Sequence, residues 1–230
     1  MKGMSLKSIL DRVQDGLKRR EEVREEVQRD MRRATRLSKQ AILFVHQERF
    51  EEARKSLKEA ENLFVKLREI SGERPDMVYI GIVEAAFEEY TEAQVFLRLV
   101  EEKGFVGPEE LGVPDVSYVL GLGDVIGEFR RRALDSLRRG DIEGAEAFLR
   151  MMEQIYIDLT AMDDAYLLVP GLRRKCDIAR RVIEATRGDV TLEARRSSLE
   201  HSIQRLEKAL KGRRRKKIGE TKSKGNLGAG

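Results

Sequence analysis

The sequence predicts an all-α protein built as a bundle of seven helices. Its 230 residues include only four prolines and no tryptophan, and 37% of them are charged, which is a composition typical of helical proteins. Apolar residues recur every three or four positions along nearly the whole chain, as they do on one face of a helix. No segment gives a convincing β-strand pattern.

The apolar spacing and the helix-breaking pairs divide the chain into elements. Residues 6–44 carry one apolar stripe, which predicts one long helix or two helices in line. A turn at 46–49 separates this stripe from a second helix over 50–70, which a Ser-Gly pair ends. Pro75 suits the first turn of a third helix, and we expect that helix to run to about Glu102.

A connector divides the predicted bundle near its middle. Residues 104–115 hold three glycines and two prolines, and one short helical turn is expected at 108–111. Four further helices are expected after the connector, at residues 116–139, 141–162, 172–187 and 191–210. Gly188 is expected to end the sixth helix, and Thr191 can cap the seventh.

Charge is distributed unevenly along the chain. From Lys211 to Gly230 there are eight basic residues and one acid, so this segment carries +7 and the rest of the chain carries −3 of the net +4. We therefore expect one helical domain over 1–211 and a basic, disordered tail over 212–230. The tail could tether nucleic acid or only increase solubility, and the sequence leaves both open.

Cysteine use and apolar run lengths bear on the compartment. Cys176 is the only cysteine, so no intramolecular disulfide can form and a reducing compartment is expected. The N-terminal segment lacks the apolar core and cleavage site of a signal peptide. No apolar run approaches the roughly 18 residues of a membrane span. We expect a cytoplasmic protein without a membrane partner.

Two carboxylate pairs lie within helical segments that should be buried. Glu89 and Glu92 are three residues apart, and Asp124 and Glu128 are four apart, so each pair lies on one helix face. Asp and Glu are almost never fully buried without a partner. The first pair alone could belong to a solvated acidic stripe. The second pair has apolar residues on almost every side, which favours a buried site.

Three glycines around the second pair predict that another helix approaches closely. Gly121, Gly123 and Gly127 each cost about 1 kcal/mol in a helix relative to alanine, so they need a packing reason. A partner helix beside Asp124 and Glu128 would bring the two acidic faces together. Clustered carboxylates repel, and at least one would take up a proton unless a cation balances them. Oxygen ligands with room for water favour Mg²⁺ or Mn²⁺.

The segments around these acids resemble the translin/TRAX family, and its archaeal members in particular. EEYTEA is similar to the family's EYxEA segment, and SYVLGLGDVIGEFRRRALDSLRRGD to its DYLLGxxDLxGEL…NSVxxGD segment. The resemblance covers nearly the whole chain. Acids stand at all four positions where the TRAX-type subunit has them and translin lacks them. Ser117 replaces an Asp of the TRAX segment, and the first helix is closer to translin.

The resemblance implies a translin-type fold that assembles into a closed homo-oligomer of about eight subunits, with nucleic-acid sites facing an internal cavity. It implies a Mg²⁺-dependent endoribonuclease that cleaves single-stranded or short duplex RNA and leaves 5′-phosphates. Glu89, Glu92 and Asp124 are then metal ligands, and Glu128 is a further ligand or the base for the attacking water. Glu88 is a weaker candidate. Single-stranded DNA stays open as an additional ligand or substrate.

Basic residues near the acidic centre would hold the RNA. The candidates follow Glu128 or lie on the sixth predicted helix: Arg130, Arg131, Arg173, Arg174, Lys175, Arg180 and Arg181. Such clusters are more often solvated faces, but an acidic site needs positive charge to approach a polyanion. No run of exposed aromatics is expected for base stacking, so binding should tolerate many sequences. His46 and His201 stand alone and predict no metal or catalytic site.

Two other classes of function remain open at this point. The chain could be a non-catalytic, oligomeric RNA- or single-stranded-DNA-binding protein of the translin type, with residual acids. It could also be a helical scaffold that binds other proteins. Cleavage of labelled RNA in Mg²⁺ and in EDTA separates the first alternative from a nuclease. A scaffold should be monomeric and indifferent to RNA.

Overall fold

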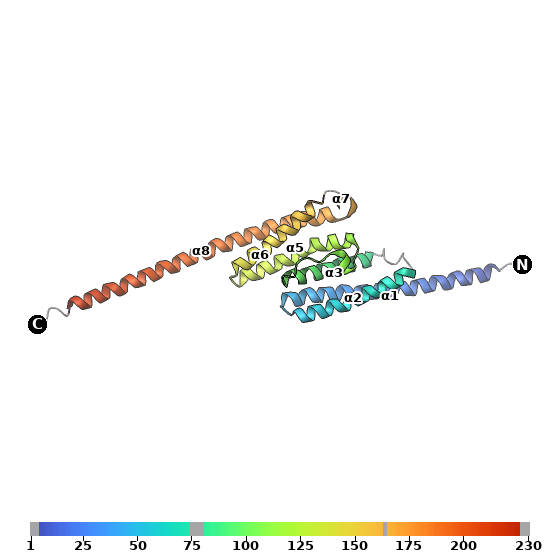
Figure 1. Cartoon of the computed structure of the whole chain (residues 1–230), viewed down its shortest axis with the longest axis horizontal. Helices are drawn as coiled ribbons and strands as arrows, with labels where there is room; N and C mark the ends of the chain where they lie inside the picture. Colours follow the sequence, from blue (N-terminus) through green and yellow to red (C-terminus); the bar gives the residue numbers. More distant parts are fainter. Residues whose placement is uncertain (1–4, 74–80, 163–164, 226–230) are drawn as a thin grey trace.

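The structure, a computed structural model, describes residues 5–73, 81–162 and 165–225. Within these residues eight helices and no strand form an elongated bundle, which confirms the all-α prediction (Figure 1). The helices are α1 (Leu6–His46), α2 (Phe50–Glu73), α3 (Gly81–Val100), α4 (Pro108–Leu111), α5 (Asp115–Arg138), α6 (Ile142–Thr160), α7 (Ala165–Leu168) and α8 (Leu172–Gly225).

The helices pack in three layers with α3 and α5 in the middle. α1 pairs with α2, and both contact α3. α3 in turn packs along α5, which also contacts α6 and α8. α3 is therefore buried on nearly all sides, as its continuous apolar sequence predicts, and its polar side chains must find partners inside the bundle.

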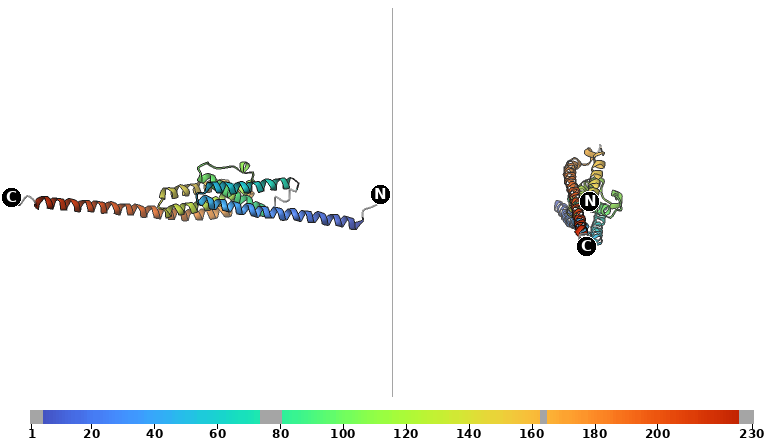
Figure 2. Two further views of the ribbon diagram at one scale, coloured as in Figure 1. Left: turned by 90° about the horizontal axis from the view of Figure 1, so that it is seen from below. Right: turned by 90° about the vertical axis from the view of Figure 1, so that its left-hand side faces the viewer.

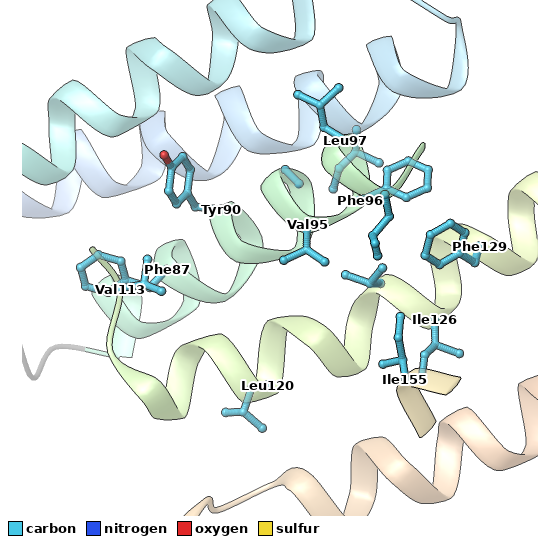
Figure 3. Packing of buried hydrophobic residues seen from close by; sticks show 14 of the residues in the cluster. Phe87, Tyr90, Val95, Phe96, Leu97, Val113, Leu120, Ile126, Phe129 and Ile155 are labelled. Carbon is cyan, nitrogen blue, oxygen red and sulfur yellow. The ribbon is translucent and has the colours of Figure 1, made fainter. Parts of the chain in front are cut away.

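Aromatic side chains hold α3 against its neighbours on two sides. The ring of Phe64 in α2 stacks on Phe87 of α3 with centroids 4.6 Å apart, and it lies 5.0 Å from the ring of Tyr90. On the other side Phe96 of α3 meets Phe129 of α5 edge to face at 5.5 Å. Figure 3 shows Phe87, Tyr90 and Phe96 along α3, and Phe129 on α5. Rings in such geometries add to the energy of burial and fix the position of α3.

Gly121 lets α5 approach α3 at very short range. A Cβ atom at this position would lie 2.7 Å from the backbone oxygen of Glu88 and 2.7 Å from Cβ of Thr91. A Cβ on Gly123 would lie 3.2 Å from Cδ of Lys175, a side chain of α8. At Gly127 it would meet no described atom within 4 Å. Two of the three glycines thus have the packing reason that the sequence predicts.

Several predicted boundaries agree with the structure. α1 is one continuous helix, with Ser5 as its N-cap accepting a hydrogen bond from the backbone of Ser8 at 3.3 Å. The short turn in the connector is α4, which begins at Pro108 and ends at Gly112 with a φ of 64°. The predicted start of the third helix at Pro75 lies outside the described residues.

The predicted break at Gly188 is wrong, because α8 continues through it as one helix. Thr186 and Val190 are buried on either side of this glycine, so packing of α8 against α5 and α6 keeps the segment helical despite the glycine. The backbone is also helical from residue 212 to Gly225, where a disordered tail is expected. The short helix α7 was not predicted from the sequence.

Both long helices extend beyond the bundle, at opposite ends. Figure 1 shows the first part of α1 projecting toward the N-terminal end, and the last part of α8 projecting the other way. The left view of Figure 2 shows the same two projections. Among the described residues, no helix is both long enough and apolar enough to cross a membrane.

Gly121→Ala is expected to lower the free energy of unfolding by about 1–3 kcal/mol, because its methyl group would overlap the backbone of α3. Gly127→Ala, two turns along the same helix, is the matched control. It should raise stability by up to about 1 kcal/mol, since its methyl group has space and alanine favours the helix. Urea unfolding of both variants measures the difference. Equal effects would contradict the close approach at Gly121.

Candidate metal and nucleic-acid site

The acids predicted from the sequence lie at the contact between α3 and α5. α3 supplies Glu89 and Glu92, and α5 supplies Asp124 and Glu128. Their charges act on one another: Asp124, Glu89 and Glu128 all raise the pKa of Glu92. In the described part of the chain, however, no three acid, histidine or cysteine side chains are arranged so that they could hold a metal ion. The acids share one neighbourhood without forming a ready-made metal cage.

Glu92 is the most deeply buried of the four acids. Its exposed fraction is 9%, and the described residues give it no hydrogen bond or ion pair. Burial and then the nearby acids raise its pKa to about 9, while Lys175 has a smaller opposite effect. The Glu92 carboxyl is therefore protonated at neutral pH in the metal-free protein. Among the described residues, it is the one of these four acids whose carboxyl has no hydrogen bond or ion pair.

Lys175 of α8 lies within the acidic centre. Its Nζ donates to Oδ2 of Asp124 at 2.5 Å and to Oε2 of Glu88 at 3.0 Å. Burial alone would lower the pKa of Lys175, but these hydrogen bonds raise it above its ordinary value. Gly123 leaves the space through which the lysine stem passes. This residue was predicted to bind nucleic acid, and the structure shows it bound to acids of the site.

His46 contacts Glu128, so the prediction that this histidine stands alone is wrong. A hydrogen bond of 2.5 Å joins its Nε2 to Oε2 of Glu128. The imidazole is only 4% exposed, lies 5.0 Å from the ring of Phe96, and has no described partner for Nδ1. No sequence signal indicated this pair, because His46 ends α1, whereas Glu128 lies 82 positions away on α5.

Glu89 lies at the edge of the centre, beside α1. Lys39 Nζ is 3.6 Å from Oε2 of Glu89 and is mostly exposed to solvent. Burial raises the pKa of Glu89, Lys39 opposes this effect, and Asp124 and Glu128 add to it. The side chains of Lys39, His46 and Lys175 therefore lie around the acids. They contact Glu89, Glu128 and Asp124, respectively.

The predicted RNA-binding arginines fall into two groups. Arg130 joins α5 to α8: it donates to Oγ1 of Thr186 at 2.7 Å and to the carbonyl of Val182 at 3.4 Å, and lies 3.5 Å from Asp189. This contact is structural. The other arginines are exposed on α5 or in the first turns of α8: Arg131, Arg173, Arg174, Arg180 and Arg181. These five side chains are accessible to a ligand.

Comparison with known proteins identifies the family of this chain. The model of the Translin family matches residues 22–211. An uncharacterized protein of Methanocaldococcus jannaschii is 29% identical over 193 residues, which cover 83% of this chain and 85% of that protein.

Solved structures of two proteins have similar folds. AfC3PO, in a complex with duplex RNA, is 32% identical with a TM-score of 0.70, and the match covers 80% of this chain and 96% of that one. The apo form of NeC3PO is 28% identical with a TM-score of 0.74, and the match covers 83% of this chain and all of that one. From the long family match and the shared fold, we conclude that this chain belongs to the Translin family.

Proposed function

We propose that this protein is a TRAX-like, metal-dependent endoribonuclease that binds RNA and cleaves it with a metal-activated water. The observation that carries the proposal is the group of four acids at the α3–α5 contact, where burial and mutual repulsion raise the pKa of Glu92 to about 9. Perturbed carboxyls of this kind gather at functional sites more often than elsewhere. The similarity to AfC3PO, which was solved with duplex RNA, supports RNA as the ligand.

The acids fit Mg²⁺ or Mn²⁺ by their chemistry. They offer hard oxygen ligands, and Glu92 has no described partner to give up. Glu89, Glu92 and Asp124 would hold the ion. Lys175 occupies only Oδ2 of Asp124, so Oδ1 of the same carboxylate would be the oxygen left to bind the ion. A divalent ion bound to Glu92 would offset the burial and the repulsion that raise its pKa.

The chain's own residues define the rest of the mechanism. When bound, the ion would supply an activated water and neutralise charge on the phosphate. Glu128 takes the proton of the attacking water, and His46 orients its carboxylate through the 2.5 Å hydrogen bond. The ammonium of Lys175 uses two of its three N–H groups on Asp124 and Glu88, and the third would donate to a phosphate oxygen of bound RNA.

RNA reaches this centre along the exposed arginines of α5 and the first turns of α8. Their positive charge offsets the acids and allows a polyanion to approach. Single-stranded DNA would bind the same surface, since phosphate contacts do not depend on the sugar. We also propose that the protein self-associates into a closed homo-oligomer of about eight copies.

One observation favours a second function, a non-catalytic RNA-binding protein of the translin type. Lys175 pairs with Asp124, Lys39 with Glu89 and His46 with Glu128. A protein that never binds metal would need such internal partners. Labelled RNA incubated with Mg²⁺, Mn²⁺ or EDTA separates the two functions: binding without cleavage in either metal would establish the second.

Asp124→Ala should abolish cleavage, with a loss of about a thousandfold or more, because a metal ligand is removed. RNA binding and assembly should remain close to those of the wild type. Asp135→Ala is the matched control, since Asp135 is an acid of the same helix that pairs with Arg138, away from the centre. Single-turnover cleavage and a filter-binding assay measure both effects. Substantial cleavage by the Asp124 variant would rule out this site.

Binding of Mg²⁺ should release close to one proton at pH 7, because the metal displaces the proton of Glu92. The affinity should rise with pH, by up to about tenfold per unit, until Glu92 ionises near pH 9. Calorimetry in two buffers with different ionisation enthalpies gives the proton count. Glu92→Gln should lose the proton release. Metal binding by the wild type without any proton release would contradict the role of Glu92.

His46→Leu should lower kcat by about 10–100-fold with little change in Mg²⁺ affinity, because the carboxylate of Glu128 loses its orienting partner. His46→Gln should recover much of the activity, since its amide can donate the same hydrogen bond. Thermal unfolding of both variants controls for the loss of a buried side chain. Equal activity of the two variants would show that the hydrogen bond has no role.

A further inference from the structure

The two projections of the molecule expose regular rows of large apolar side chains. We call residues 6–20 of α1 the N-terminal arm, and residues 191–211 of α8 the C-terminal arm. The N-terminal arm exposes Leu6, Leu10, Val13 and Leu17. The C-terminal arm exposes Leu192, Leu199, Ile203, Leu206 and Leu210. Each of these side chains is between 47% and 71% exposed, although large apolar residues on one face of a helix are usually covered.

The spacing of both rows is that of a coiled-coil seam. The N-terminal row advances by four, three and four residues from Leu6 to Leu17, and the C-terminal row does the same from Leu199 to Leu210. Such steps alternate between the two core positions of a heptad. Since the pattern is symmetric, the rows also match when the two helices run in opposite directions. The facing pairs are then Leu6 with Leu210, Leu10 with Leu206, Val13 with Ile203, and Leu17 with Leu199.

The two arms of one chain cannot cover each other, because they project from opposite ends of the bundle (Figures 1 and 2). α1 and α8 nevertheless run in the same direction along the molecule. A second copy, turned about a two-fold axis perpendicular to the long axis, would therefore lay its C-terminal arm antiparallel along the N-terminal arm of the first. Because the axis is two-fold, the N-terminal arm of the second copy would make the same contact with the C-terminal arm of the first.

Charge beside the seam favours this pairing over one between two C-terminal arms. Glu193, Glu200 and Glu207 follow one flank of the C-terminal row at steps of seven. In an antiparallel pair of C-terminal arms these glutamates would face each other across the seam, and like charges there are destabilising. In the pairing with the N-terminal arm, Lys7 instead lies beside Glu207, and the uncharged Gln14 beside Glu200.

The other flank of the seam is suited to close packing. In the same register Ile9 of the N-terminal arm lies beside Ala209, and Gly16 lies beside Ser202. Ile9 is 41% exposed in the single chain and would be covered in the pair. Ile9 is the one large side chain on this flank, and Gly16, Ser202 and Ala209 are small. The two helices can therefore approach each other closely along this side. Thus the N-terminal arm matches the C-terminal arm in spacing and volume, and Lys7 and Glu207 add one pair of opposite charges.

We propose that the N-terminal arm of one copy binds antiparallel to the C-terminal arm of a second copy, and the reverse, in a two-fold pair. This inference rests on the self-association included in the proposed function and specifies which surfaces meet. The Translin family match begins at residue 22. The N-terminal row, from Leu6 to Leu17, therefore lies outside the segment that this chain shares with the family model.

Cross-linking of the full chain tests the pairing. Val13→Cys and Ile203→Cys chains, distinguished by mass, are mixed and oxidised; the wild type, whose single Cys176 is buried, is the control. We expect disulfide-linked dimers that contain one chain of each kind, with several-fold fewer from either chain alone. Equal linking of Ile203→Cys chains to one another would overturn the proposal in favour of paired C-terminal arms.

A charge placed in the seam tests the same contact without a cross-link. Leu10→Glu should weaken self-association by at least about tenfold in sedimentation equilibrium, because it places a charge against Leu206 of the neighbouring copy. Ile157→Glu is the matched control, since Ile157 is a similarly exposed apolar residue of α6 outside both arms. If the wild type assembles and Leu10→Glu leaves assembly unchanged, this inference fails while the proposed self-association stands. A monomeric wild type would overturn both.

Discussion

The close contact between α3 and α5 is the constraint on which the rest of the structure depends. It requires a residue without a side chain at Gly121, because the backbone of α3 occupies the place of a Cβ atom. The aromatic rings of Phe87, Tyr90 and Phe96 fix α3 against α2 and α5. Since both helices carry acids on the faces that meet, the packing of the core also determines where negative charge gathers.

The bundle balances that charge with side chains from its two outer layers. α1 contributes Lys39 and His46, and α8 contributes Lys175. Each of these residues lies far in sequence from the acid that it contacts. The acidic centre is therefore a property of four helices together, and removing any one cation would leave a partly buried carboxylate without its partner.

Most of the helices could be predicted from the sequence, and so could the meeting of the four acids between two helices. The residues that contact these acids could not. The acids could be found because helical spacing alone places Asp124 and Glu128 on one face. The contacts of His46 and Lys175 depend on how α1 and α8 cross α5, and local patterns do not contain that information. The prediction that the helix ends at Gly188 was wrong for a related reason. The low helix propensity of glycine is a weak effect, and the buried side chains on both sides of Gly188 override it.

The continuity of α8 has a mechanical consequence. One uninterrupted helix contains both Lys175, within the acidic centre, and Leu192, at the start of the exposed row, about 25 Å further along its axis. A continuous helix resists axial compression, so an axial displacement of its distant end would be transmitted along α8 toward Lys175. If the proposed docking of a second copy displaced α8, docking and the hydrogen bond between Lys175 and Asp124 would be thermodynamically linked, and each would influence the other.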